Sequence, residues 1–147
     1  MMFLCDTNVW LALLLQGHDH HRASRAWFDS TPQPAEAVLC RPVLISLARL
    51  LTTAAVMSAV SREALTNREA WDILDDVIAD ERVRVDADEP PGIERAWRRG
   101  SARGTASPKL WRDSYLAAWA SCAGWTLVST DHAFTQFPDV SVVVIAR

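Results

Sequence analysis

The chain has 147 residues, half of them hydrophobic, with 15 Lys and Arg, 18 Asp and Glu, and a formal net charge of -3. The apolar fraction excludes intrinsic disorder, and the length is sufficient for one domain with a real core, which we expect over residues 1–147. The negative charge gives no global attraction to nucleic acid, so a polyanion would need a local basic patch or a bound metal ion.

Five short apolar runs predict β-strands, and longer helical patterns lie between them. The strands are expected at 2–5, 37–40, 82–85, 126–129 and 141–145. This alternation is typical of βαβ units and predicts an α/β fold, a single-domain α/β/α sandwich with a mostly parallel five-stranded sheet. Right-handed crossovers would place helices on both faces of that sheet.

The first helices are predicted from their start and stop signals. One is expected over 8–16, with Gly17 ending it, and a second over 18–30, with Asp19 capping it. A third is expected over 42–51, because its first residue is a proline.

The second half of the chain adds three more helices. Thr66 and Glu69 have the spacing of a capping box and predict the start of the fourth helix. Two further helices follow proline sites, one over 92–103 and one that ends at Gly124. The polar stretch 55–65 is expected to be a mobile loop.

Three aspartates are predicted to converge at one edge of the sheet. Asp6 follows the first strand and Asp131 follows the fourth, so both belong at the carboxyl edge, where ligands bind in such folds. Asp113 shares a helix face with apolar residues at +3, +4 and +7 and should point to the same edge. Clustered carboxylates repel unless a proton or a hard cation relieves them, so Mg²⁺ or Mn²⁺ is the expected cofactor.

Each aspartate also has a purely structural interpretation. Asp6 could cap the first helix, Asp113 could be a partner of the helix dipole, and Asp131 could form an Asx turn. The three together favour a site over three separate caps.

Three stretches carry a resemblance that covers essentially the whole chain: FLCDTNVWLALLLQGHDHHRASRAW, CRPVLISLARLLTT and WRDSYLAAWASCAGWTLVSTDHAF. The chain resembles a PIN domain, specifically a VapC-type toxin ribonuclease of bacterial toxin-antitoxin pairs. The resemblance implies a metal-dependent endoribonuclease whose acidic residues fall on Asp6, Asp113 and Asp131, with Asn8 and Thr130 beside them. It also implies a homodimer and a small VapB-type antitoxin whose tail enters the acidic site.

Roles follow from the chemistry of phosphodiester hydrolysis, which needs an activated water and positive charge on the phosphoryl oxygens. Asp6 and Asp131 are expected to bind the metal directly or through water, and Asp113 to bind it or to orient the attacking water. Asn8 and Thr130 would hydrogen-bond to these ligands. For Thr130, a local bond to the backbone is equally favoured.

One position departs from the family pattern. Such domains usually carry a further acidic residue early in the third helix, and alignment through Arg41 and residues 49–52 places Leu44 there. Leucine cannot bind a metal, so a second cation site is absent, or is completed by phosphate and water or by another carboxylate such as Glu36. The alternative function is a catalytically degenerate PIN-fold module that binds RNA or an antitoxin.

Basic and aromatic residues give weaker signals. Arg112 and Arg41 are the expected RNA contacts. A basic stripe is interpreted as a solvated helix face: Arg95, Arg98, Arg99 and Arg103. A histidine cluster is interpreted as the start of a helix rather than a zinc site: His18, His20 and His21. Four tryptophans on predicted helices are interpreted as core or interface residues rather than base-stacking platforms: Trp10, Trp27, Trp111 and Trp119.

The cysteines and the hydropathy indicate a soluble cytoplasmic protein with no membrane span. Cys5, Cys40 and Cys122 lie in apolar surroundings without CxxC spacing, as buried thiols of a reducing compartment do. No uninterrupted apolar run reaches the roughly 18 residues of a membrane helix. A receiver-like phosphoacceptor domain is disfavoured, because no adjacent acid follows the first strand and no lysine follows the last.

Overall fold

A sheet of five parallel strands forms the centre of the structure, a computed structural model that describes residues 1–147. The strand order is β3-β2-β1-β4-β5. The strands are β1 (Phe3–Cys5), β2 (Ala37–Cys40), β3 (Val83–Asp86), β4 (Thr126–Ser129) and β5 (Val142–Val144). The α/β prediction is confirmed, every expected strand is present to within one residue at each end, and all the pairings are parallel.

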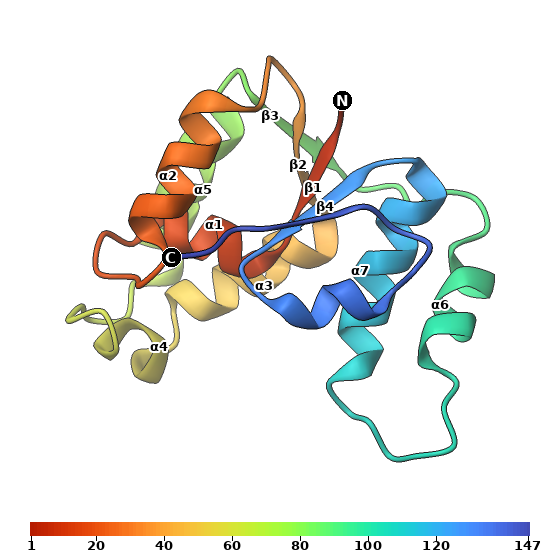
Figure 1. Cartoon of the computed structure of the whole chain (residues 1–147). Helices are drawn as coiled ribbons and strands as arrows, with labels where there is room; N and C mark the ends of the chain where they lie inside the picture. Colours follow the sequence, from red (N-terminus) through yellow and green to blue (C-terminus); the bar gives the residue numbers. More distant parts are fainter.

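Helices cover both faces of this sheet (Figure 1). Right-handed crossovers place α1, α2, α3 and α5 on one face and α6 and α7 on the other. The helices are α1 (Thr7–Leu14), α2 (His21–Ser30), α3 (Arg41–Leu51), α4 (Ala54–Ser58), α5 (Asn67–Ala79), α6 (Ile93–Ser101) and α7 (Leu110–Ala123), with a 3₁₀ helix η1 (His132–Gln136) after β4. The predicted sandwich is confirmed.

Burial explains why the inner strands are uniformly apolar. Every residue of β1 and β2 is buried, whereas the edge strands β3 and β5 have only one exposed residue between them and are otherwise half-buried. A parallel strand with helices on both sides has no solvent face and therefore reads as a continuous apolar run. The core cluster of 30 buried residues is centred on these strands.

Two predicted helix signals are confirmed in detail. The Thr66 hydroxyl accepts a hydrogen bond from the Glu69 N–H at 3.1 Å, and the Glu69 carboxylate accepts one from the Thr66 N–H at 3.0 Å. At the end of α7, Gly124 adopts the left-handed conformation with φ of 71°. Glycine takes this conformation without the Cβ clash of other residues.

The signals for the first two helices were wrong in their details. α1 ends before Gly17, whose φ is not positive; a Cβ at Gly17 would lie 3.0 Å from the Val60 carbonyl oxygen, so close backbone approach requires the glycine. α2 begins at His21, and Asp19 does not cap it. The Asp19 carboxylate instead forms an ion pair with Arg147 at 3.0 Å, a partner far away in the sequence.

The predicted loop at 55–65 begins inside a helix, α4. The Met57 side chain on this helix is fully buried in the core. Burial of one apolar side chain thus accounts for the helical turn at 55–58, whereas residues 59–65 are turn and loop, as predicted.

Three of the four tryptophans lie in or against the core, as predicted, and an interface role stays a prediction for the fourth, Trp111. Trp10 and Trp119 are buried in the core, and Trp27 packs edge-on against Phe3 with ring centroids 5.5 Å apart. Trp111 is 59% exposed and does not belong to the core. It contacts Trp97 of α6 at the outer surface, with ring centroids 6.1 Å apart.

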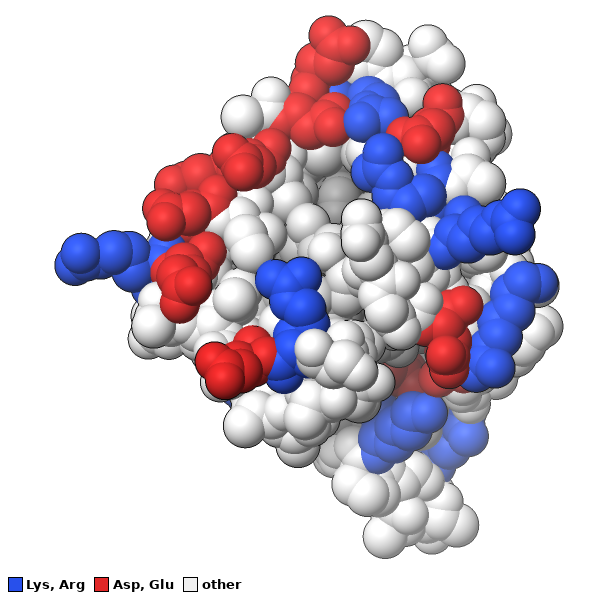
Figure 2. Space-filling view, turned by 90° about the vertical axis from the view of Figure 1, so that its left-hand side faces the viewer, with Lys and Arg blue, Asp and Glu red and all other residues white.

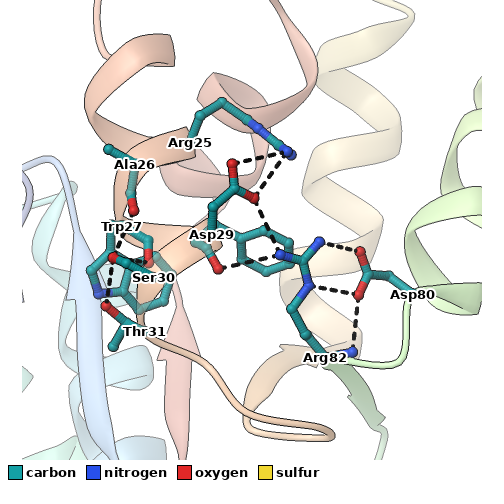
Figure 3. A network of polar contacts seen from close by, with 9 residues as sticks. Arg25, Ala26, Trp27, Asp29, Ser30, Thr31, Asp80 and Arg82 are labelled. Atoms are coloured by element: carbon teal, nitrogen blue, oxygen red, sulfur yellow. Dashed lines mark hydrogen bonds and ion pairs between the residues drawn. The ribbon is translucent and has the colours of Figure 1, made fainter.

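A polar network fastens α2 to the start of β3 (Figure 3). The Arg82 guanidinium donates to both Asp80 carboxylate oxygens at 2.9 and 2.7 Å and to Asp29 at 3.2 Å, and it lies 4.1 Å from the centroid of the Phe28 ring. Arg25 reaches Asp29 from the same helix at 3.0 Å. This network anchors the edge strand to the helical layer.

Candidate active site

A cleft opens at the carboxyl edge of the sheet, where β1 and β4 lie side by side. From β1 the chain proceeds outward to β2 and β3, and from β4 it proceeds the other way to β5, so the strand order reverses here. Ligands bind at such a switch point. The cleft has a volume of about 480 Å³ and is lined by Asp6, Thr7, Asn8, Ser46, Arg49, Leu50, Thr53, Pro108, Lys109, Arg112, Asp113, Asp131 and Phe134.

Asp6 stands between β1 and α1 and is only 6% exposed. Its Oδ1 accepts a hydrogen bond from the Thr7 N–H at 2.7 Å, and its Oδ2 accepts one from the Ser129 hydroxyl at 3.0 Å. Burial raises the pKa of Asp6, and the negative charge of Asp113 raises it further, although the two hydrogen bonds oppose them. Asp6 therefore caps α1 and also places a buried carboxylate, whose ionised form is disfavoured by burial, at the cleft.

Asp131 is held in a different electrostatic environment. Its Oδ1 accepts from the Ala133 N–H at 2.8 Å, which caps η1, and its Oδ2 accepts from the Lys109 ammonium at 3.2 Å. The backbone hydrogen bond is the main cause that lowers the pKa of Asp131, and Lys109 adds to it. Asp131 is accordingly the most readily ionised of the three acids.

Asp113 lies in the first turn of α7, four residues after Lys109, and its side chain makes no hydrogen bond in the structure. Partial burial raises the pKa of Asp113, and the charge of Asp131 adds to the rise, while the ammonium of Lys109 opposes it. The Asp131 hydrogen bond in turn raises the pKa of Lys109. Burial is thus the main reason why two of the three carboxylates have raised pKa values.

The donor set fits a hard divalent cation in its chemistry. Three carboxylates line one cleft, and two of them have raised pKa values, as a cluster short of positive charge should. The side chains do not, as they stand, form a group of three that could ligate one ion, and the Lys109 ammonium occupies the space beside Asp131. Direct ligation by all three would require side-chain rotation.

The hydrogen-bonding partner of the acids is Ser129 rather than Thr130. The fully buried Ser129 hydroxyl donates to Asp6 and accepts from the Asp131 N–H at 3.0 Å, so it joins the two strand ends. Thr130 makes no side-chain hydrogen bond, and Asn8 lines the cleft with its side chain exposed and unbonded. The available signal was strand alternation, which places residues 129 and 131 on one side of β4.

The cationic residues of the cleft were only partly foreseen. Arg112 lines it and donates to the Thr7 hydroxyl at 2.7 Å. Arg41 is exposed at the start of α3 and does not line the cleft. Arg49 and Lys109 do line it and were missed. The spacing of four residues between Lys109 and Asp113 was a usable signal, whereas nothing local marked Arg49.

No fourth carboxylate lines the cleft. Leu44 is 3% exposed and belongs to the hydrophobic core. Glu36 precedes β2, at the opposite edge of the sheet, where it accepts from the N-terminal ammonium at 2.8 Å. Glu36 is therefore excluded as a substitute for the missing acid.

The other polar clusters show structural roles. Within the basic stripe of α6, Arg98 pairs with Glu94 at 3.1 Å, and Arg103 donates to Gln136 at 2.8 Å, as expected of a solvated face. The histidine cluster does not form a group that could hold a metal. His21 instead lies 2.7 Å from the Ala12 carbonyl oxygen through its Nδ1.

All three cysteines are free thiols, and Cys5 and Cys40 are buried. Burial raises the pKa of Cys40 to about 11 and that of Cys5 further, so neither thiol is a nucleophile near neutral pH. No helix of the structure combines the length and the apolar character that crossing a membrane requires.

Comparisons with known proteins agree with this geometry. The PIN domain family model matches residues 3–140. Ribonuclease VapC41 of Mycobacterium tuberculosis is 47% identical over 146 residues, which cover 99% of this chain and 100% of that protein. Two solved structures share the fold. VapC20 of Mycobacterium tuberculosis, described as a Sarcin-Ricin loop cleaving toxin, has a TM-score of 0.60 and 22% identity over 95% of this chain and 98% of its own. VapBC2 from Rickettsia felis, bound to a DNA fragment from their promoter, has a TM-score of 0.60 and 14% identity; the match covers 97% of this chain and 98% of that one.

Proposed function

We propose, from the premise that the chain belongs to the PIN-domain family in its VapC branch, that it is a divalent-metal-dependent endoribonuclease. In this proposal it is the toxin of a toxin-antitoxin pair and hydrolyses RNA phosphodiester bonds with Mg²⁺ or Mn²⁺. The observation that carries the proposal is the convergence of Asp6, Asp113 and Asp131 on the cleft at the switch point.

The three carboxylates would hold the metal ion. When bound, the ion supplies Lewis-acid charge on the phosphoryl oxygens and lowers the pKa of a bound water. Asp6 is fixed by its bonds to Thr7 and Ser129, so its carboxylate is oriented before any ligand arrives. Asp113 has no such partner, so its carboxylate is free to turn toward the ion or to orient the attacking water.

The proposed partners follow from family membership. A VapB-type antitoxin is expected to bind the toxin and block the acidic cleft. A homodimer is the expected assembly, supported by large apolar side chains that are exposed on the outer faces of α3 and α5: Ile45, Trp71 and Ile78. The free thiols support a reducing, cytoplasmic location.

A second candidate is a degenerate PIN-fold module that binds RNA or antitoxin without cleaving. The observation in its favour is that Leu44 is in the core and leaves three acids in the cleft. It predicts RNA binding with no cleavage under any metal condition.

The test is to incubate the purified chain with Mn²⁺ and total tRNA, and to follow cleavage on a denaturing gel. The matched variants are Asp6→Asn and Asp72→Asn, which make the same chemical change inside the cleft and at the exposed surface of α5. We expect cleavage by the wild type and Asp72→Asn, and none by Asp6→Asn or after chelation. Cleavage that survives Asp6→Asn or a chelator contradicts the metal-nuclease proposal.

A further inference from the structure

The cleft contains as many basic as acidic side chains. Asp6, Asp113 and Asp131 supply the acids, and Arg49, Lys109 and Arg112 supply the bases. The net charge of these six groups is zero when all are ionised. An RNA strand is therefore attracted only if some of the bases remain available to its phosphates.

Two of the bases are already bonded to the protein. The Lys109 ammonium pairs with Asp131 at 3.2 Å, and the Arg112 guanidinium donates to the Thr7 hydroxyl at 2.7 Å. The Arg49 guanidinium forms no hydrogen bond and no ion pair in the structure. Its five N–H donors are therefore all free to bind a ligand in the cleft.

Arg49 is placed in the cleft by the geometry of α3. Three residues of this helix, with Thr53 just beyond its end, line the cleft at spacings of three and four, which is one helix face: Ser46, Arg49, Leu50 and Thr53. The guanidinium thus lies on a face that also presents two hydroxyl groups.

A simpler role for Arg49 does not explain this placement. Arg49 is in the last turn of α3, where a cation interacts favourably with the helix dipole. That interaction needs only a basic residue near the helix end, on any face. It accounts neither for the position of Arg49 at the cleft nor for the lack of a protein partner.

On the face shown in Figure 2, acidic side chains form a row along the upper left, and basic side chains lie along the right with acidic ones among them. With a net charge of -3, the protein depends on local cations to bind RNA.

We propose that Arg49 binds a backbone phosphate of a single-stranded RNA in the cleft and thereby positions the adjacent phosphodiester at the three carboxylates. This inference rests on the proposed function for its ligand. A planar guanidinium binds phosphate through two parallel hydrogen bonds, which fix orientation as well as charge. Arg49 is thus a positioning residue contributed by α3, whereas the acids come from the strand ends and α7.

The test measures RNA binding without cleavage. A short fluorescein-labelled single-stranded RNA is titrated in EDTA, with fluorescence anisotropy as the readout, for the wild type, Arg49→Gln and Arg22→Gln. Arg22 is the matched control, because it is an exposed arginine of α2 that lies outside the cleft and has no protein partner. Circular dichroism melts check that all the variants are folded.

We expect Arg49→Gln to weaken binding about five- to tenfold, as the loss of one charge-assisted contact to phosphate does, and Arg22→Gln to leave it unchanged. Each phosphate contact to a single strand contributes about 0.7 to the magnitude of the slope of log K against log salt concentration. Arg49→Gln should therefore also lower the magnitude of this slope by about 0.7. Arg49→Lys should keep the slope and recover only part of the affinity, since an ammonium lacks the planar fork.

Three results overturn the inference: wild-type affinity for Arg49→Gln, equal losses for Arg49→Gln and Arg22→Gln, and no RNA binding by the wild type in EDTA. The cleavage assay in Mn²⁺ separates this inference from the proposed function. If RNA binding depends on Arg49 and no cleavage occurs, the inference stands and the nuclease proposal is refuted. If cleavage occurs and RNA binding does not depend on Arg49, the nuclease proposal stands and the inference is refuted.

Discussion

Replacing Asp6 by asparagine should stabilise the fold while it removes the proposed activity. The Asp6 side chain is 6% exposed, and burial is the largest influence on its pKa, which is raised despite two hydrogen bonds. The folded protein therefore prefers the neutral form of this group. Asparagine has nearly the same shape and can keep the cap on Thr7, but it carries no charge to desolvate.

The size of the effect is a difference between opposing contributions. Removing a buried charge relieves a desolvation cost of several kcal/mol and the repulsion from Asp113. Against this, the bond from the Thr7 N–H is kept but now goes to a neutral oxygen, and the amide NH2 that replaces the second oxygen cannot accept from the Ser129 hydroxyl and must donate to it instead, a loss of about 1 kcal/mol for each bond. We expect a net gain of about 1 kcal/mol, or roughly 2–4 °C in Tm for a chain of this size.

The assay is thermal unfolding of the wild type and Asp6→Asn in EDTA, followed by tryptophan fluorescence across a pH series. Because the folded pKa of Asp6 lies above its unfolded value, the folded wild type takes up a proton first as the pH falls, and its stability rises relative to the variant. The advantage of Asp6→Asn should be full above the folded pKa of Asp6 and shrink as the pH falls through it. Added Mn²⁺ should stabilise the wild type by about 2.7 kcal/mol at 100 times the Kd of the site, which exceeds the advantage of the variant and reverses the order.

A wild type that melts above Asp6→Asn at neutral pH without metal would refute this reasoning. Ser129→Ala provides the control, because it leaves a buried Asp6 oxygen without its donor and should cost about 1–3 kcal/mol. The same change made in the Asp6→Asn background should cost less, since no charge then depends on the hydroxyl. Equal costs in both backgrounds would show that Ser129 does not stabilise the carboxylate.

Three further outcomes are expected. Arg82→Gln should destabilise the protein by about 1–2 kcal/mol in urea unfolding, since it loses the bonds to Asp80 and the Phe28 ring. The pKa of Asp80 is lowered, mainly by its hydrogen bond with Arg82, so this difference should disappear as the pH falls through the folded pKa of Asp80. Leu44→Glu should cost about 3 kcal/mol or more and Leu44→Met under about 1.5, also in urea; a tolerated glutamate would place residue 44 in the cleft after all. Lys109→Met should lower the Mn²⁺ concentration that half-maximally raises Tm, and an unchanged midpoint would show that Lys109 does not compete with the ion.

Local patterns predicted the elements whose stability is local. The strands were identified because buried parallel strands are continuous apolar runs, and the capping box of Thr66 and Glu69 is complete within four residues. The misplaced features depend on distant partners. Asp19 pairs with Arg147 at the other end of the chain, and α4 is ordered by the burial of Met57 in the core.

The candidate site likewise has features that local sequence predicts and features that depend on packing between distant elements. The position of Asp6 and Asp131 in one cleft follows from parallel strands that both end in an acid, and this needs no knowledge of side-chain packing. The choice between Ser129 and Thr130 needed the facing of β4, and the place of Arg49 needed the orientation of α3. Both are set by packing between elements, which a single sequence does not display.

The structural and functional interpretations of the aspartates are compatible, and the first supports the second. Asp6 caps α1 and Asp131 caps η1, yet each carboxylate oxygen has two lone pairs and accepts a single hydrogen bond. Every oxygen thus keeps one lone pair for a ligand. The caps fix the orientation of two acids in advance, which reduces the conformational entropy lost when a ligand binds. Asp113 has no bond of its own and is left free to adapt, so a rigid pair and one adjustable carboxylate share the cleft.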